Sequence, residues 1–105
     1  MLDKRKFYID GKWISPSKPN DLEVINPSTE EAFATISLGS KEDTNSAVSA
    51  AKKALVTWSQ SSKEERINLL EKLLDIYKKR YSEMTEAISM EMGAPIDWSN
   101  DAQTS

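Results

Sequence analysis

Hydrophobic residues follow a helical rhythm over the longest periodic stretch of this chain, residues 62–93. They recur at alternating spacings of three and four positions, which brings them onto one face of a helix. The members of this stripe are Ile67, Leu70, Leu74, Tyr77, Tyr81, Met84 and Ile88, and Leu69, Leu73 and Ile76 widen it. The pattern predicts one amphipathic helix over residues 62–93. Because such a helix draws most of its stability from packing, we expect its apolar face to lie against another surface.

Both ends of this predicted helix carry sequence signals. Ser62 and Glu65 have the spacing of a capping box, in which each side chain accepts a hydrogen bond from the backbone of the other residue. Gly93 can adopt the left-handed conformation that ends a helix, and Pro95 prevents its continuation. Since proline is allowed in a first helical turn, we expect residues 96–105 to begin another helix and the chain to end within it.

A second, shorter helix is predicted to begin after Ser40. Ser40 is the expected N-cap, and the acidic residues Glu42 and Asp43 suit the positive end of a helix. The apolar stripe of this helix consists of Ala47, Val48, Ala51, Ala54, Leu55 and Trp58. Its alanines make the stripe thin, which permits close approach to another element.

The first 39 residues have the pattern of β-hairpins. Asp10-Gly11 stands between two short apolar runs, and this pair favours a type I′ turn that would bring Tyr8 opposite Trp13. Residues 22–25 and 32–38 form a second predicted pair of strands, joined by a turn at 26–29. The predicted fold class is therefore α+β and helix-rich, a single partial domain over 1–105. N-terminal β-hairpins occupy residues 1–39, and residues 40–105 hold two long amphipathic helices and the start of a third.

Composition and charge narrow the functional classes. The 105 residues suffice for one domain, and a net charge of −3 argues against nucleic acid or an anionic membrane as the main partner. No apolar run approaches the roughly 20 residues of a membrane span. The charged N-terminus has no apolar stretch behind it that would form a signal peptide. We therefore expect a cytoplasmic protein that binds neither nucleic acid nor membrane.

The chain contains no cysteine and no histidine. Their absence removes disulfides, thiolate zinc sites, thiol nucleophiles and the commonest general base. Only carboxylates, lysine, tyrosine or an activated serine remain as routes to catalysis. We therefore predict that the chain alone is not an enzyme, and we assign no catalytic, cofactor-binding or metal-binding residue.

Three carboxylate pairs and one basic triplet are the remaining candidates for a site. The pairs Glu30-Glu31, Glu42-Asp43 and Glu64-Glu65 could act as acid–base groups or bind a cation. Neighbours in sequence point apart, however, and two of the pairs fall in first helical turns, where the helix dipole favours acids. The triplet 78–80, Lys-Lys-Arg, could bind phosphate, but cations in the latter half of a helix usually face solvent. We favour a structural role for the three pairs and a solvent-exposed position for the triplet.

A series of short motifs, in order and at matching spacing, resembles the opening of the aldehyde dehydrogenase superfamily. They are residues 7–13 (Phe-Tyr-Ile-Asp-Gly-Lys-Trp), 24–31 (Val-Ile-Asn-Pro-Ser-Thr-Glu-Glu), 36–43 (Ile-Ser-Leu-Gly-Ser-Lys-Glu-Asp), 47–51, Trp58 and 66–74. A last motif, Glu91-Met92-Gly93-Ala94-Pro95, is similar to the family's Glu-x-Gly-Lys-Pro element. Glu30 departs from the family at a position that is often glycine, and Ala94 replaces the common lysine.

The resemblance implies a parent several times longer that oxidises an aldehyde to a carboxylate with NAD(P), through a thiohemiacetal and a hydride transfer. In the family, the Rossmann-type cofactor domain, the general-base glutamate and the nucleophilic cysteine lie downstream of this segment. The resemblance therefore transfers no catalytic or cofactor residue to this chain. It implies an N-terminal fragment, truncated before those parts, with no cofactor of its own.

Two hypotheses about function follow. The first is the structural N-terminal portion of an NAD(P)-dependent aldehyde dehydrogenase, and the second is a stand-alone helical module for interaction or oligomerisation. The spacing of the 62–93 stripe also suits a coiled-coil seam, although its width favours an ordinary core-facing surface. For the isolated chain we expect a homo-oligomer through this helix, because its apolar face would otherwise remain in water.

Overall fold

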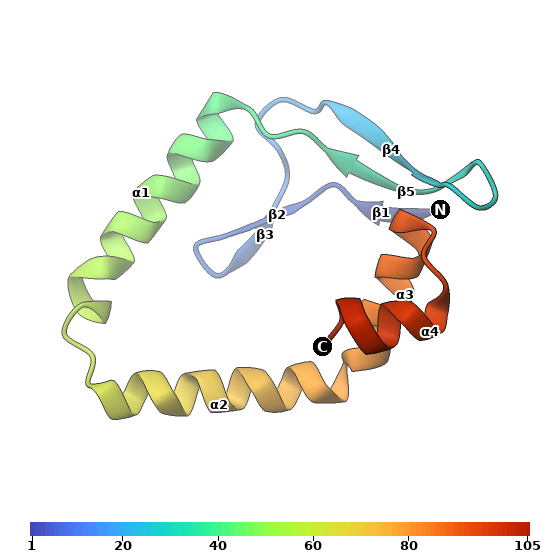
Figure 1. Ribbon diagram of the computed structural model, residues 1–105. Coiled ribbons are helices and arrows are strands. Elements are labelled where there is room, and N and C mark those ends of the chain that lie inside the picture. The colour runs from blue at the N-terminus through green and yellow to red at the C-terminus, as the bar shows by residue number, and fades with distance from the viewer. The chain divides into compact units, whose positions relative to one another are not determined.

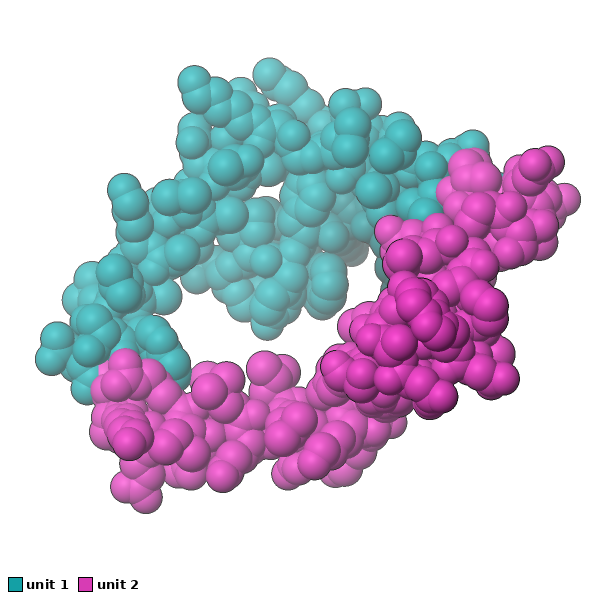
Figure 2. Space-filling model, viewed as in Figure 1, with its two compact units in different colours: residues 1–24, 32–60 teal, residues 25–31, 61–105 magenta.

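The computed structural model describes residues 1–105, which divide into two compact units (Figure 2). Unit 1 comprises residues 1–24 and 32–60, and unit 2 comprises residues 25–31 and 61–105. Five short strands come first along the chain and the helices follow (Figure 1), so the predicted α+β class is confirmed.

The first predicted hairpin is present in unit 1. Strand β2 (Phe7–Ile9) pairs antiparallel with β3 (Lys12–Ile14), and Tyr8 lies opposite Trp13 with ring centroids 5.2 Å apart. The turn residues Asp10 and Gly11 have φ angles of 53° and 73°. Positive φ at both central residues is the requirement of a type I′ turn, whose twist matches that of the strands.

A three-stranded sheet has the order β1-β5-β4, formed by β1 (Leu2–Lys4), β4 (Asp21–Asn26) and β5 (Glu31–Ser37). The pair β4 and β5 was predicted, but β1 was not. Strand β1 runs parallel to β5, with Leu2 opposite Ala34. Three residues of mixed polarity carry no alternation signal, and their partner strand lies about thirty positions away in sequence, so local pattern does not reveal this pairing.

The turn between β4 and β5 places Glu30 in the left-handed region, with φ at 59°. The Asn26 side chain accepts a hydrogen bond from the Ser28 N–H at 2.9 Å, and the Glu30 N–H donates to the Asn26 carbonyl at 2.8 Å. A residue with a Cβ is strained at such a φ, whereas glycine is not. This conformation explains physically why a glycine suits the position that Glu30 holds.

Helix α1 (Lys41–Trp58) begins with the predicted Ser40 cap. The Asp43 carboxylate accepts from the Ser40 N–H and from the Ser17 N–H, both at 2.9 Å, so it ties the preceding loop to the start of the helix. These backbone N–H donors hold the pKa of Asp43 below its ordinary value. An exposed ion pair between Lys18 and Glu42, 3.5 Å long, lies beside this cap.

The prediction of a single helix over residues 62–93 is wrong at one point. The structure divides this segment into α2 (Lys63–Lys79) and α3 (Tyr81–Met92). Arg80 lies between them with φ −105° and ψ 14°, outside helical geometry. Neither proline nor glycine causes the break. On its two sides, the Tyr77 and Tyr81 hydroxyls donate to the Thr104 and Asn100 carbonyls, both at 2.6 Å. Hydrophobic spacing continues unchanged across the break, so periodicity could not predict it.

The remaining end signals of these helices are confirmed. Ser62 and Glu65 form the capping box of α2, and Gly93 ends α3 with φ at 72°. A Cβ at Gly93 would come 2.7 Å from Pro27 Cγ, so the turn between β4 and β5 packs directly on the end of α3. After Pro95 the chain forms α4 (Ile96–Trp98) and a π-helical turn, Ser99–Gln103.

Hydrophobic burial is slight throughout the chain. Ala34, 5% exposed, is its one buried hydrophobic residue, and the other fully or nearly buried residues are the polar Ser37, Asp43, Thr85, Ser99 and Thr104. No helix combines the length and the apolar character that a bilayer crossing requires.

We predict that Gly11→Val disrupts the β2–β3 hairpin. No atom lies within 4 Å of the position that a Cβ would take, so the cost is backbone strain at φ +73°, about 1–3 kcal/mol. Amide hydrogen exchange of residues 7–14 should accelerate. Gly39→Ala is the matched control, because Gly39 lacks a positive φ and meets only Phe7 at 3.8 Å, and exchange in the same residues should stay unchanged.

Glu30→Gly should stabilise the turn between β4 and β5, by up to about 1 kcal/mol, because it removes left-handed strain. The matched change Glu31→Gly, within β5, should instead destabilise the chain by about 0.5–1 kcal/mol. Urea unfolding of both variants measures whether the two substitutions change the free energy of unfolding in opposite directions. Equal destabilisation by both substitutions would contradict the assignment.

The start of α1 should lose stability in acid. The pKa of Asp43 is lower in the folded chain than in the unfolded chain, so its contribution is complete above the unfolded value, about 3.9, and disappears as pH falls through the folded value. Helicity measured by circular dichroism should therefore fall in this acidic range. Asp43→Asn should make helicity less dependent on pH in this range. If the variant and the parent lose helicity identically, Asp43 is not the cause.

Candidate functional site

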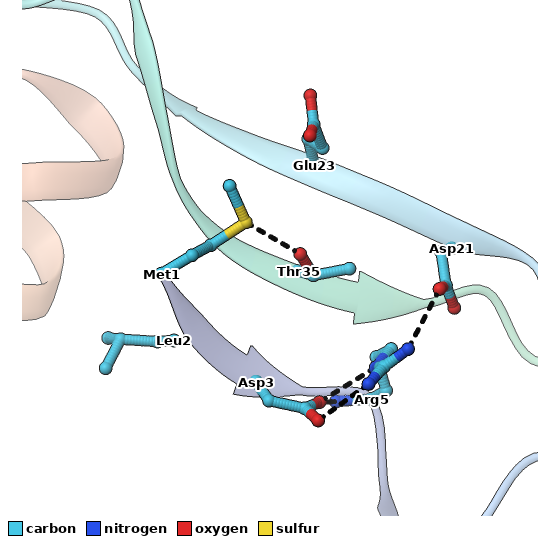
Figure 3. Close-up of a pocket in the computed structure, with 7 residues that line it drawn as sticks. All are labelled: Met1, Leu2, Asp3, Arg5, Asp21, Glu23 and Thr35. Carbon is cyan, nitrogen blue, oxygen red and sulfur yellow. Dashed lines mark hydrogen bonds and ion pairs between the residues drawn. The ribbon is translucent and has the colours of Figure 1, made fainter.

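A hollow of about 350 Å³ opens in unit 1 beside the three-stranded sheet (Figure 3). It is lined by Met1, Leu2, Asp3, Arg5, Asp21, Glu23 and Thr35. Strand β1 and the residues just after it supply one wall, and β4 and β5 supply the other. Four of these lining residues, Asp3, Arg5, Asp21 and Glu23, are charged.

Arg5 is the centre of this charged cluster. Its Nε and Nη2 donate to the two carboxylate oxygens of Asp3 at 2.9 and 2.8 Å, and its Nη1 donates to Asp21 at 3.2 Å. The guanidinium holds the pKa of the Asp3 carboxyl well below its usual range, and the Asp3 carboxylate, followed by that of Asp21, raises the pKa of Arg5. Asp3 faces Arg5 with both oxygens (Figure 3), which is the fork geometry of a strong arginine–carboxylate pair.

The polar side chains around this hollow connect strands and do not form a reactive site. Arg5 directs its guanidinium to two carboxylates, so it has little capacity left for an anionic ligand. The Thr35 hydroxyl donates to the Met1 sulfur at 3.0 Å rather than to a base that could activate it. Because Asp3 belongs to β1 and Asp21 begins β4, the Arg5 bonds connect the two outer strands of the sheet across β5.

A second pair of hollows lies between the β2–β3 hairpin and α1. Their volumes are about 580 and 330 Å³, and both include Ile9, Asp10 and Ala50 in their walls. The helix contributes mainly alanine and serine, and the hairpin contributes Tyr8, Ile14 and the turn. The small side chains of the predicted stripe therefore face the hairpin, as close approach requires.

The charged groups singled out in the sequence do not converge on one site, and four of them have individual partners. Asp43 and Glu65 cap their helices, Glu42 pairs with Lys18, and Arg80 pairs with Glu83 at 2.7 Å. No three carboxylates lie together in an arrangement that could hold a metal ion. The tyrosine hydroxyl bonds to the C-terminal segment, by contrast, were missed, because carbonyl acceptors leave no signal in a sequence.

A dinucleotide does not fit the residues present. A pyrophosphate binds at a helix N-terminus that follows a strand, through free backbone N–H groups and a glycine-rich loop. The chain has one such junction, from β5 through Gly39 and Ser40 into α1. There the Asp43 carboxylate accepts from the Ser40 N–H, and the Ser40 hydroxyl accepts from the Asp43 N–H. A second anion at this point would meet the charges of Asp43 and Glu42.

Comparison with known proteins finds relatives that agree with one another on a single family. A sequence model described as the aldehyde dehydrogenase family matches residues 13–104. A 3-succinoylsemialdehyde-pyridine dehydrogenase from Pseudomonas sp. is 45% identical over 96 residues, which cover 91% of this chain and 20% of that protein.

Solved structures agree with this similarity. An aldehyde dehydrogenase from Bartonella henselae is 60% identical with a TM-score of 0.98, over 99% of this chain and 22% of that one. A mutant of aldehyde dehydrogenase C from Pseudomonas syringae, in complex with NAD⁺ and octanal, is 40% identical with a TM-score of 0.93, over 95% of this chain and 21% of that one.

The chain thus spans about a fifth of the length of the relatives that it matches. The matched part of each relative extends over nearly all of this chain, and its backbone follows the same course. The chain belongs to the aldehyde dehydrogenase family and corresponds to its N-terminal region.

Proposed function

We propose that this chain is the N-terminal structural portion of an NAD(P)-dependent aldehyde dehydrogenase and performs no chemistry by itself. One observation carries the proposal. The chain has the backbone of a fifth of the Bartonella henselae enzyme, with a TM-score of 0.98, yet its large apolar side chains remain exposed. A segment that forms its elements without burying a core is suited to packing on the remainder of a larger protein.

The reaction of the complete polypeptide would be oxidation of an aldehyde to a carboxylate. Support comes from the relatives, since the structure of the Pseudomonas syringae protein holds NAD⁺ and octanal together. When bound, the nicotinamide would accept the hydride, and a residue outside these 105 would supply the nucleophile. The cytoplasmic location expected from the sequence stays a prediction.

The contribution of this chain's own residues is to present preformed packing surfaces. The Ser40–Asp43 and Ser62–Glu65 capping boxes define where the two long helices begin. The Pro27 contact of Gly93 fixes the end of α3 against the turn between β4 and β5. These local contacts fix where the helices begin and end, and the apolar stripes of the helices stay exposed for a partner surface.

The alternative function is a stand-alone module for interaction or oligomerisation. The exposure of large apolar residues on α1 and α2 favours it, because Val56 is 71% exposed and Leu70 is 62% exposed. The coding frame after Ser105 separates the two functions. A frame that continues to a downstream cysteine supports the dehydrogenase portion, and a stop codon supports the module.

A chimeric enzyme tests the proposal directly. We predict that replacing the matching N-terminal fifth of the Bartonella henselae enzyme with this chain yields a soluble dehydrogenase. Because the chain would only supply packing, its turnover should lie within about tenfold of the parent, equivalent to about 1.4 kcal/mol. Reduction of NAD⁺ or NADP⁺ with an aldehyde that the parent enzyme oxidises provides the measurement, and the 105-residue chain alone should give none.

Controls separate packing from chemistry in this chimera. Leu70→Glu with Leu74→Glu should prevent accumulation of folded enzyme, whereas Asn68→Glu, on the polar face of α2, should leave turnover unchanged. A soluble chimera that binds cofactor but lacks activity would contradict a purely structural role. Turnover by the isolated chain would also contradict a purely structural role.

A further inference from the structure

The π-helical turn Ser99–Gln103 interrupts a segment that begins with α-helical hydrogen bonding. The Ser99 N–H donates to the Pro95 carbonyl, four residues back, at 2.9 Å, whereas the Thr104 N–H donates to the Ser99 carbonyl, five residues back, at 3.0 Å. Residues 96–105 contain neither proline nor glycine, which are common causes of an irregular helix. Another common cause is a side chain that bonds into the hydrogen-bond ladder from outside.

Tyr81, the first residue of α3, makes such a bond. Its hydroxyl donates to the Asn100 carbonyl at 2.6 Å. In an α-helix the Asn100 carbonyl would accept from the Thr104 N–H, four residues on. A donor outside a helix draws a carbonyl away from the helix axis and weakens its bond within the ladder. The bond from Tyr81 therefore falls on the one acceptor whose loss turns an α-helical bond of Thr104 into the observed π-helical one.

The π-helical turn decides which side chains face α3. In an α-helix, positions five apart point about 140° away from each other, so Ser99 and Thr104 would lie on different faces. The π-helical turn closes over five residues, and both are buried, with exposures of 0% and 2%. The Thr104 hydroxyl lies 3.0 Å from that of Thr85 on α3, which is 4% exposed. With α-helical spacing, Gln103 would take the place of Thr104.

We propose that the Tyr81 hydroxyl holds this segment in the π-helical form by drawing the Asn100 carbonyl away from the Thr104 N–H. Tyr81 is thus a positioning residue, which acts through a backbone carbonyl and selects Thr104 for the contact with Thr85. Without the hydroxyl, the segment takes α-helical spacing and the residues after the turn rotate by about 100°. The inference is independent of the proposed function, because every group in it belongs to unit 2.

Scalar couplings across hydrogen bonds, measured by NMR on the 105-residue chain, identify the acceptor directly. In the parent, the Thr104 amide nitrogen should couple to the Ser99 carbonyl carbon. Tyr81→Phe keeps the ring and removes only the hydroxyl, so this coupling should be lost and one to the Asn100 carbonyl carbon should replace it. A Ser99 coupling that persists in Tyr81→Phe would overturn the proposal, as would its absence from the parent.

Two matched variants isolate the role of Tyr81. Tyr77→Phe also removes a hydroxyl that donates to a carbonyl of this segment, but that carbonyl belongs to Thr104 and is no acceptor for the Thr104 N–H. Thr85→Val removes the buried hydroxyl contact at nearly constant side-chain volume. Both variants should retain the coupling of Thr104 to Ser99. A change of acceptor in Thr85→Val would assign the turn to the threonine contact and overturn the proposal.

Thiol labelling distinguishes rotation of the segment from general loosening. The chain has no cysteine, so an introduced thiol is the only one present. Thr104→Cys, at a buried position, should react faster with a thiol reagent when it is combined with Tyr81→Phe. Gln103→Cys, at a half-buried position, should react more slowly in the same combination, because α-helical spacing turns it toward α3. Faster reaction at both positions would indicate loosening without rotation and would overturn the proposal.

Discussion

Exposed apolar surface is the main physical constraint on this structure. Two amphipathic helices, α1 and α2, carry ten of the exposed large hydrophobic side chains, whereas the one buried hydrophobic residue is Ala34 on β5. Burial of apolar area is the main favourable term in folding, at about 25 cal/mol per Å². Because little apolar area is buried within the chain, the apolar faces of the helices are where further burial could stabilise it, as expected for part of a longer polypeptide.

Polar contacts organise the chain in the absence of a core. Asp43 joins the Ser17 loop to the start of α1, and Arg5 connects β1 to β4. In unit 2, Thr85 and Thr104 meet at 3.0 Å where the C-terminal segment returns to α3. Hydrogen bonds of this kind each contribute only about 1 kcal/mol net, but they are directional. They therefore define the course of the backbone more than they stabilise it.

This division of roles suits the family assignment. The residues with the clearest geometric purpose are caps, turns and strand connections, and none of them is arranged around a reacting atom. The Asn26-Pro27 turn and Gly93, two separate pieces of the family resemblance, turn out to be in contact, since Pro27 lies where a side chain at position 93 would be. Their association in the sequence thus reflects packing between two segments rather than shared chemistry.

The sequence by itself determined the local elements, because their signals lie within a few residues. The Asp10-Gly11 turn, the Ser40 N-cap, the Ser62–Glu65 capping box and the Gly93 helix end could all be predicted from side-chain types at short spacing, as could the family. Tertiary structure alone decided three features that depend on distant partners: the parallel pairing of β1 with β5, the break at Arg80 and the bonds of Tyr77 and Tyr81 to the C-terminal segment. Their partners are mostly backbone groups, which every residue carries, so no pattern of side chains in the sequence could mark them.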